Sequence, residues 1–354
     1  MSGVFAIRTD ASAAIGSGHI RRMTILARYL KAEGLTTLLL CGPDTEAVLP
    51  AVRDVFDTVT VIGTEDDGVA ALAGQDAELV GVFFDHYGLG ADTHRMYRKV
   101  VPFLAAIDDM ADRVLDVDMV FDVNLGRDST TYSGLVPDHT ELHVGSRFQI
   151  IDPIFVGLRQ ACLSRRQQDR EGIARLFIAM GGTDPFGMTV QALETAAETL
   201  PEARIDVVAG SMTADLPHLR ASAARYGDRV ALHVDATNVA QLMCQADLAI
   251  GAGGTMTWER NCLGLPSVVL VLTDNQTMVG SAMAAAEAAI VLDAQKGYPD
   301  RGVADALTFL AHHPETLRDM GRKAAELGGE DGAALIARTL NARIEENRKT
   351  KEEA

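Results

Sequence analysis

The chain passes from a strand into a helix across Arg8 to Leu30, which read R-T-D-A-S-A-A-I-G-S-G-H-I-R-R-M-T-I-L-A-R-Y-L. The preceding apolar run, Val4 to Ile7, is typical of a strand. Residues 9–18 are small, polar and rich in glycine, which predicts a loop. Apolar residues then recur at helical spacing, at Ile20, Met23, Leu26 and Leu30. A strand, a glycine loop and a helix start together present unpaired backbone N–H groups to an anion.

Within this stretch, His19 lies in the first turn of the predicted helix. The positive end of a helix disfavours the imidazolium, so we expect a neutral ring. A neutral imidazole beside a glycine loop built on Gly16 and Gly18 is suited to general-base catalysis. The alternative is that His19 only caps or packs the helix. The dinucleotide-binding fingerprint does not fit, because Arg21 stands where a third glycine is required.

The composition indicates a two-domain globular protein. The 354 residues are 47% hydrophobic, with no apolar run of membrane-spanning length and no signal-peptide layout. The cysteines are scattered without a C-x-x-C pair, so neither a disulfide framework nor a zinc site is expected and a reducing cytoplasm is the simplest location. They are Cys41, Cys162, Cys244 and Cys262.

The formal charge of −17 argues against sequence-independent binding to nucleic acid, which needs a basic surface. An anionic ligand must therefore be held by local backbone N–H groups and a few arginines. Arg21 and Arg22 are two such residues, and they either contact a diphosphate or offset the surface acidity.

Short apolar runs alternate with helical stretches, which predicts an α/β fold with two Rossmann-like, doubly wound domains facing a cleft. The expected domains are 1–152 and 173–340, joined by a linker at 153–172 and followed by a charged, solvated helical tail at 341–354. Predicted strands are Val4–Ile7, Thr37–Cys41, Thr58–Ile62, Leu79–Phe84, Phe103–Ile107, Met119–Val123, Leu176–Met180, Ile205–Ala209, Val230–Val234, Leu248–Ile250, Ser267–Leu272 and Ala289–Leu292.

Two strand ends in the first half carry polar side chains. Asp85-His86-Tyr87 follows one strand and forms either a turn with a satisfied aspartate or the wall of a substrate site. Asp108-Asp109 ends the next strand and suggests either a metal or acid/base pair or the cap of a following helix. Capping is preferred, because no further ligand lies at useful spacing, and no metal is expected.

The second half has two glycine pairs at strand ends, Gly181-Gly182 and Gly253-Gly254, and each precedes a predicted helix. Both can turn N–H groups toward a phosphate, although Gly-Gly also occurs in ordinary turns. Glu259 lies four residues after Thr255, on the same helical face, where its carboxylate can accept bonds from ribose hydroxyls. The alternative is a surface glutamate.

A polar segment also follows the next strand. Asn275 and Gln276, within Thr273-Asp274-Asn275-Gln276, can donate to phosphate or sugar oxygens, unless Asp274 or Asn275 simply caps a helix. No P-loop, H-E-x-x-H or G-x-S-x-G motif is present. Nucleotide binding by two α/β domains without a P-loop points to nucleotide-sugar chemistry.

Five motifs carry a family resemblance. They are I-G-S-G-H-I-R-R at Ile15–Arg22, D-H-Y-G at Asp85–Gly88, G-L-V-P at Gly134–Pro137, M-G-G-T-D at Met180–Asp184 and N-Q at Asn275-Gln276. In this order and spacing, over residues 4–340, the chain resembles the UDP-2,4-diacetamido-2,4,6-trideoxy-β-L-altropyranose hydrolases of pseudaminic acid biosynthesis, a pathway that supplies flagellin glycosylation.

The resemblance implies a glycosyltransferase-B-like fold related to MurG, with water replacing the sugar acceptor and no cofactor. It implies that His19 is the catalytic base and that Tyr87 and Asn275 line the sugar site. It also implies that Gly254, Thr255 and Glu259 hold UDP. Gly253-Gly254-Thr255 is more glycine-rich than in some members and nearer the transferase pattern, which leaves a different donor sugar open.

The chemistry agrees with this expectation. Ordinary glycoside hydrolysis needs a carboxylic acid to protonate a poor leaving group, whereas a nucleoside diphosphate leaves readily. One base that activates water is then sufficient, and attack at the anomeric carbon breaks the C–O bond with inversion. The alternatives are a glycosyltransferase of the same fold, a UDP-sugar 2-epimerase, and a non-catalytic nucleotide-sugar-binding protein. The oligomeric state and the substituents of the sugar are not predicted.

Overall fold

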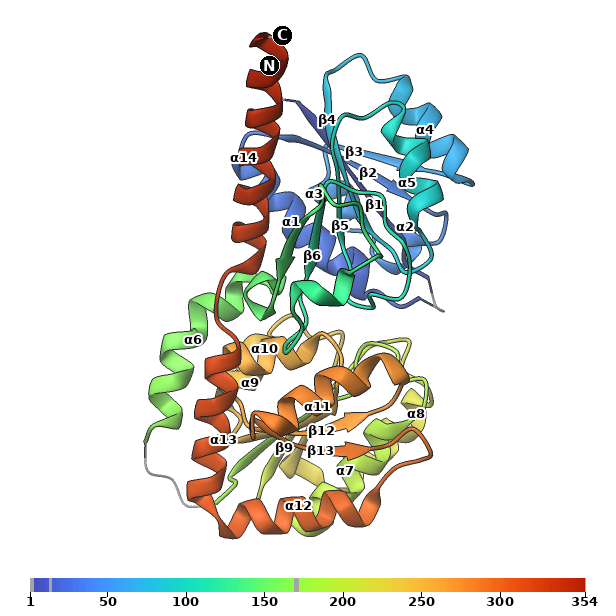
Figure 1. Ribbon diagram of the computed structural model, residues 1–354. Helices are drawn as coiled ribbons and strands as arrows, with labels where there is room; N and C mark the ends of the chain where they lie inside the picture. Colours follow the sequence, from blue (N-terminus) through green and yellow to red (C-terminus); the bar gives the residue numbers. More distant parts are fainter. Residues whose placement is uncertain (1–2, 13–14, 169–171, 354) are drawn as a thin grey trace. The chain divides into compact units, whose positions relative to one another are not determined.

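The computed structural model describes residues 3–12, 15–168 and 172–353 (Figure 1). The chain forms two compact units. Unit 1 contains Met1–Ile151 and Asp331–Ala354, and unit 2 contains Asp152–Glu330. The N-terminal half of the chain therefore shares its unit with the C-terminal helix.

Unit 1 is built on a parallel sheet of seven strands. In spatial order these are β3 (Thr58–Val61), β2 (Thr36–Cys41), β1 (Val4–Thr9), β4 (Leu79–Asp85), β5 (Leu104–Ile107), β6 (Met119–Asp122) and β7 (Glu141–Val144). The strand order reverses between β1 and β4, and ligands of such sheets bind at the carboxyl ends of the strands beside this reversal.

Helices cover both faces of this sheet, so the buried strands read as continuous apolar runs. One face packs against α1 and α14, and the other against α4 and α5 (Figure 1). The helices of unit 1 are α1 (Gly18–Ala32), α2 (Thr45–Val48), α3 (Val52–Val55), α4 (Glu65–Ala73), α5 (Ala91–Arg98) and α14 (Gly332–Glu353), with short 3-10 turns at Ser129–Tyr132 and Ser146–Phe148.

Unit 2 repeats the plan with six parallel strands. Their order is β10 (Val230–Val234), β9 (Arg204–Ala209), β8 (Arg175–Ala179), β11 (Leu248–Ala252), β12 (Ser267–Val271) and β13 (Ala289–Asp293). The reversal lies between β8 and β11. The prediction of two doubly wound α/β sheets is confirmed.

The helices of unit 2 enclose its sheet, and the main core joins α7 and α12 to the central strands. They are α6 (Pro153–Arg166), α7 (Met188–Thr199), α8 (Leu216–Arg225), α9 (Val239–Gln245), α10 (Met256–Cys262), α11 (Thr277–Ala285), α12 (Asp300–His312) and α13 (Pro314–Leu327), with 3-10 turns at Gly227–Arg229 and Asp274–Gln276. In the part of the chain that the structure describes, no helix is both long enough and apolar enough to span a bilayer.

Most of the segment expected to be a linker, 153–172, is helix α6. Asp152 caps this helix, with its Oδ1 accepting a hydrogen bond from the Ile154 N–H at 3.0 Å, and Pro153 occupies the first turn. Proline is favoured there because its missing N–H would have no partner in any case. Asp152-Pro153 therefore starts a helix of unit 2, where a break was predicted.

The C-terminal segment also differs from the expectation of a solvated tail. α14 begins at Gly332 and packs on α1 of unit 1, with Leu340 and Ile344 buried in the core. Residues 331–340, which were expected in the second domain, thus lie in unit 1. The charged residues of this segment occupy the other side of an amphipathic helix.

Two further features were not predicted. Cys162 of α6 and Cys244 of α9 form a disulfide across 82 residues, although no disulfide was expected. Their spacing carries no signal, because the fold alone brings them together. β7 was missed because Glu-Leu-His-Val is short and half polar, as edge strands commonly are.

Candidate functional site

The reversal point of unit 1 holds a buried histidine–aspartate pair. β1 leads through the glycine loop into α1, which places His19 in its first turn, and β4 ends at Asp85. The His19 Nδ1 lies 2.6 Å from Oδ1 of Asp85. The Asp85 side chain is completely buried and that of His19 is 9% exposed. Two strands adjacent in space but distant in sequence thus bring the pair together.

Two groups meet Nδ1 of His19: Oδ1 of Asp85 at 2.6 Å and Nη2 of Arg22 at 3.1 Å. A carboxylate can only accept a hydrogen bond, so in the shorter contact Nδ1 donates its hydrogen to Asp85 and the lone pair of the ring lies on Nε2. Among the described residues Nε2 makes no hydrogen bond, and it is not one of the buried atoms without a partner. Tyr87 packs edge-on against the ring, with centroids 4.5 Å apart. His19 makes no side-chain cap bond to the helix, so of the two structural alternatives only packing remains beside the predicted catalytic role.

Arg22 joins the pair from the next turn of α1. Its Nε and Nη2 donate to the two oxygens of Asp85 at 2.6 and 2.5 Å, and Nη1 donates to Oδ2 of Asp109 at 3.1 Å. The Tyr87 hydroxyl donates to the same Asp109 oxygen at 3.3 Å. The other oxygen of Asp109, Oδ1, is buried without a partner among the described residues. The guanidinium of Arg22 thus holds two carboxylates, an arrangement that was not predicted.

These contacts keep the charges of the cluster in place. Burial alone would raise the pKa of Asp85, but the charge of Arg22 and the contact with His19 outweigh it, so this pKa lies well below its usual value. Burial and the charge of Asp109 raise the pKa of Tyr87 above its usual value, so the phenol stays protonated and donates. Asp85 is thus a permanent anion behind the imidazole.

A second network flanks the cluster. Asp10, after β1, accepts from Arg8 at 2.6 Å and contacts His86 Nε2 at 3.2 Å. Asp108 accepts from the Ala111 N–H at 2.9 Å and from Arg113 at 2.9 Å, so it caps a turn and forms an ion pair. Across the described ranges, no group of three or more His, Cys, Asp or Glu side chains is arranged to hold a metal ion.

The glycines of the first loop are placed as turn residues. Gly16 has a φ of +82°, a conformation that favours glycine, and its N–H donates to the Ser12 carbonyl at 2.8 Å. Gly18 is the exposed first residue of α1. Arg21 points away from the cluster, with its Nε donating to Ser17 at 3.2 Å. The loop therefore delivers His19 while its own backbone stays accessible at Gly18.

The reversal point of unit 2 has a different character, because backbone dominates it. The loop after β11 contains Gly254, whose Cα faces open space, and the exposed Thr255, which is the N-cap of α10 and makes no side-chain cap bond. Glu259 lies one turn into α10 and is half-buried. These three predicted UDP-binding residues are thus brought to one strand end.

Gln276 ties this loop to the next one. Its Oε1 accepts from the N–H of Gly253 at 3.2 Å and of Leu272 at 3.0 Å, which leaves the amide nitrogen as a donor. Asn275 beside it is exposed, and its Oδ1 accepts from Thr273 at 2.5 Å. No side chain caps the helical turns here, so the alternative of capping by Asp274 or Asn275 is not observed.

The loop after β8 is the weaker phosphate candidate. Gly182 is exposed, but Asp184 already accepts from the N–H groups of Met188 and Thr189 at 3.0 and 2.8 Å. The start of α7 is therefore capped from within the protein, so an anion at this strand end has only the N–H groups of the Gly181-Gly182 loop to bind, as predicted for Gly182. Any ligand here would contact the loop backbone, which packs tightly against Gly210.

Reasoning from the sequence missed the cluster behind His19. Asp85 had been considered only as part of a turn or wall, and Asp109 only as part of a metal pair or cap. The signal was present in the adjacent strand ends, but nothing in the sequence showed that β1 lies between β2 and β4. The spacing of Arg22 three residues after His19, one helical turn away, was a second signal.

Comparison with solved structures defines the class of protein. Acinetobacter baumannii MurG aligns with 97% of this chain and all of its own at a TM-score of 0.70 and 13% identity. The UDP-GlcNAc 2-epimerase of Neisseria meningitidis aligns with 96% of this chain and 99% of its own at a TM-score of 0.63 and 13% identity. The chain has the glycosyltransferase-B type of fold.

Among curated proteins, the chain is 25% identical over 260 residues to the UDP-2,4-diacetamido-2,4,6-trideoxy-β-L-altropyranose hydrolase of Campylobacter jejuni, covering 71% of this chain and 85% of that protein. It is 29% identical over 167 residues to the spore coat polysaccharide biosynthesis protein SpsG of Bacillus subtilis, covering 47% of this chain and 48% of SpsG. No protein-family model matches. The resemblance to the hydrolase is confirmed as a distant relationship, and the Campylobacter hydrolase and the Neisseria epimerase are both named for a UDP-sugar.

Proposed function

We propose that this protein is a hydrolase that releases UDP from a UDP-linked 2,4-diacetamido-2,4,6-trideoxyhexose. The observation that carries the proposal is the Asp85–His19 pair at the reversal point of unit 1, in which Nδ1 bonds to the carboxylate and Nε2 has no hydrogen-bond partner among the described residues. The distant relationship to the Campylobacter jejuni hydrolase supports the same activity. The product would be a free sugar of the kind used for pseudaminic acid-type nonulosonates.

In this proposal His19 removes a proton from water as the water attacks the anomeric carbon. Nε2 takes the proton, Nδ1 keeps its hydrogen bond to Asp85, and the fixed carboxylate stabilises the imidazolium that forms. The electron pair of the broken C–O bond leaves with the UDP oxygen. Attack opposite to UDP inverts the anomeric centre.

UDP is held, in this proposal, by the loops of unit 2. The accessible backbone at Gly254 and the Thr255 hydroxyl would contact the diphosphate, and Glu259 would accept from the ribose. The amide nitrogens of Gln276 and Asn275 would donate to sugar or phosphate oxygens. Backbone donors fixed before the ligand arrives stabilise the charge that develops on the leaving group.

In this proposal, Tyr87 contacts the sugar and Arg22 orients Asp85, and neither residue takes part in the proton transfer. Tyr87 packs against the His19 ring and is 42% exposed, so its ring is able to contact the sugar while Asp109 holds its hydroxyl. Arg22 balances the charge of the buried Asp85 and fixes its orientation. No step of the proposed reaction requires a cofactor.

The test is a reaction in ¹⁸O-water with UDP-linked diacetamido-trideoxyhexoses of differing stereochemistry. We expect one ¹⁸O atom in the free sugar and none in UDP, with NMR showing the inverted anomer first. Label in UDP would place the cleavage at phosphorus and overturn the mechanism. An epimerised UDP-sugar, transfer only to an added acceptor, or an intact donor would replace hydrolysis by epimerisation, glycosyl transfer or simple binding, respectively.

A further inference from the structure

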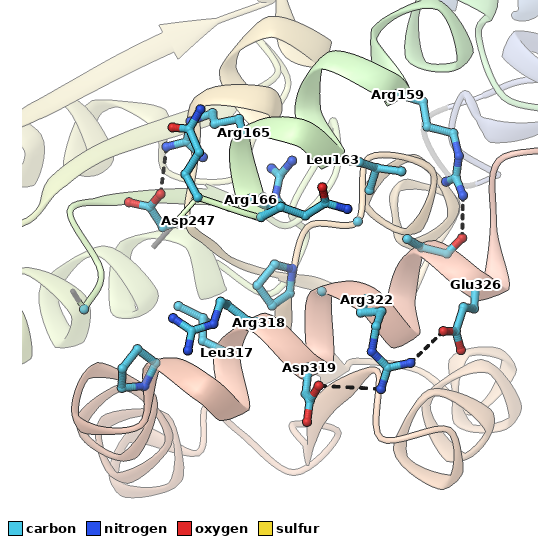
Figure 2. A pocket seen from close by; sticks show the side chains of 18 residues that line it. Arg159, Leu163, Arg165, Arg166, Asp247, Leu317, Arg318, Asp319, Arg322 and Glu326 are labelled. Carbon is cyan, nitrogen blue, oxygen red and sulfur yellow. Dashed lines mark hydrogen bonds and ion pairs between the residues drawn. The ribbon is translucent and has the colours of Figure 1, made fainter. Parts of the chain in front are cut away.

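Unit 2 contains a cavity at the amino ends of its strands, whereas the glycine loops follow their carboxyl ends. The cavity has a volume of about 450 Å³ and lies between α6, α13 and the residues that precede β11 and β12 (Figure 2). Two of its lining residues directly precede strands: Asp247 precedes β11 and Pro266 precedes β12. The carboxyl ends of the same strands carry Gly254 and Gln276. The cavity is therefore separate from the proposed nucleotide site.

Its lining combines an apolar surface with fixed positive charge. Leu163, Pro266, Leu317 and Ala325 contribute the apolar part. Among the residues that the structure describes, the lining also includes five arginines and three carboxylates, in a chain whose net charge is −17. Small-molecule sites commonly have this volume, a mostly apolar wall and a few placed polar groups.

The positive charge persists because neutral groups hold two of the arginines. Arg159 donates to the carbonyls of Cys262 and Ala325 at 2.6 and 2.7 Å. Arg166 donates to the carbonyls of Met243 and Leu263 at 2.7 and 2.8 Å. A carbonyl fixes a guanidinium without cancelling its charge. By contrast, carboxylates neutralise Arg165, through Asp247, and Arg322, through Glu326 and Asp319 (Figure 2).

Arg166 also has an unmet donor. Its Nε is buried and has no hydrogen-bond partner among the residues that the structure describes. Burial lowers the pKa of Arg166 to about 9, so the side chain is still charged at neutral pH, and a nearby anion would favour its charged form. The carbonyl contacts therefore fix the charged Arg166 side chain in the wall of the cavity.

From this arrangement we infer that the cavity is a binding site for a small organic anion that carries its charge on an apolar body. The charged end lies toward Arg166 and Arg318, and the body lies on Leu163 and Leu317. Positioning the arginines beforehand reduces the cost of ordering them on binding. This inference does not depend on the proposed hydrolase activity.

The test compares two dyes of the same shape and different charge. Anilinonaphthalene sulfonate is an anion with an aromatic body, and phenylnaphthylamine is its neutral counterpart. We expect the sulfonate to bind the full-length protein at one site, with unchanged affinity when UDP is saturating. Arg166→Met and the surface variant Arg318→Glu are each expected to weaken sulfonate binding about tenfold, and neutral dye binding by less than about twofold.

Arg220→Glu is the matched control, because it makes the same charge change on the exposed surface of α8, away from the cavity. It is expected to leave both dyes within about twofold of wild type. If Arg166→Met fails to fold, the effect of Arg318→Glu on sulfonate binding tests the inference instead. The inference is overturned by any of four results: no sulfonate binding, displacement by UDP, insensitivity to both cavity variants, or equal loss of both dyes.

Discussion

The two units use the same sheet plan but build different surfaces at their reversal points. In unit 1, Asp85 and Asp109 at or after the strand ends pair with His19 and Arg22 of α1 in the structure without a ligand. In unit 2 the equivalent strand ends carry glycine loops whose polar groups are mostly backbone. In the proposed function, this difference assigns side-chain chemistry to unit 1 and recognition of the nucleotide by main-chain donors to unit 2.

Burial explains why the two solutions look so different. A charged side chain can be buried only when it is paired, so reactive groups in unit 1 need a surrounding cluster. A backbone N–H is a donor whose position the fold already fixes, and a ligand can approach it closely where the residue has no side chain, as at Gly254. Substitutions in one unit are therefore expected to have different effects from substitutions in the other.

The largest effect is expected for His19→Ala. The variant should lose about 10²–10⁴-fold in kcat, because the positioned base is gone, while UDP affinity stays within about twofold since unit 2 is untouched. Turnover is followed by UDP release and affinity by calorimetry. His139→Ala, at an exposed histidine of unit 1, is the control. Wild-type turnover in His19→Ala would remove this residue from the mechanism.

A smaller loss is expected for Asp85→Asn. An amide does not carry the charge that stabilises the imidazolium and no longer fixes one tautomer, so kcat should fall about 10–100-fold with KM little changed. Asp92→Asn, at a fully exposed carboxylate that pairs with Arg95, should leave kcat unchanged. A parallel rise in KM without loss of kcat would show that Asp85 shapes substrate binding instead.

In unit 2, Gly254→Ala and Gly210→Ala form a matched pair. A Cβ at Gly254 meets nothing within 4 Å, so the melting temperature should not change, but UDP affinity should fall about tenfold if the diphosphate contacts this backbone. A Cβ at Gly210 would lie 2.0 Å from the Gly182 carbonyl, so this variant should melt several degrees lower. Unchanged UDP binding in Gly254→Ala would move the nucleotide elsewhere.

The smallest effect concerns acid stability. The pKa of Asp85 is lowered in the folded state, so its stabilising contribution is present above the unfolded value near 3.9 and is lost as pH falls through the folded one. Unit 1 should therefore weaken first below about pH 4. Trp258, the single tryptophan, lies in unit 2, so circular dichroism should change at a higher pH than tryptophan fluorescence. Coincident transitions would contradict independent acid sensitivity.

Most of the fold was predictable because its signals are local. Apolar runs bounded by glycine and polar turns correctly located twelve strands, including those at the reversal point of each sheet. The alternation of these strands with helical stretches indicated parallel sheets. α6 was missed because Asp152-Pro153 was interpreted as a break, although Asp before Pro is also a helix start. The place of α14 in unit 1 depends on long-range packing that periodicity does not reveal.

The candidate site was predictable only in part. His19 and the residues around Gly254 were found, because each follows a strand and precedes a helix, which is a local pattern. The partners of His19 were not, because the contact with Asp85 spans 66 residues and requires that β1 and β4 be neighbours. The sequence identifies candidate groups, whereas the strand order determines which of them meet.

The return of α14 to unit 1 has a consequence for how the chain assembles during synthesis. Ala333, Ile336, Ala337, Leu340 and Ile344 complete the core of unit 1, yet they leave the ribosome only after all of unit 2. A nascent chain that ends before residue 331 therefore exposes an unfilled apolar face beside α1, which is open to aggregation or chaperone capture. Unit 2, whose residues are contiguous, is able to finish folding first.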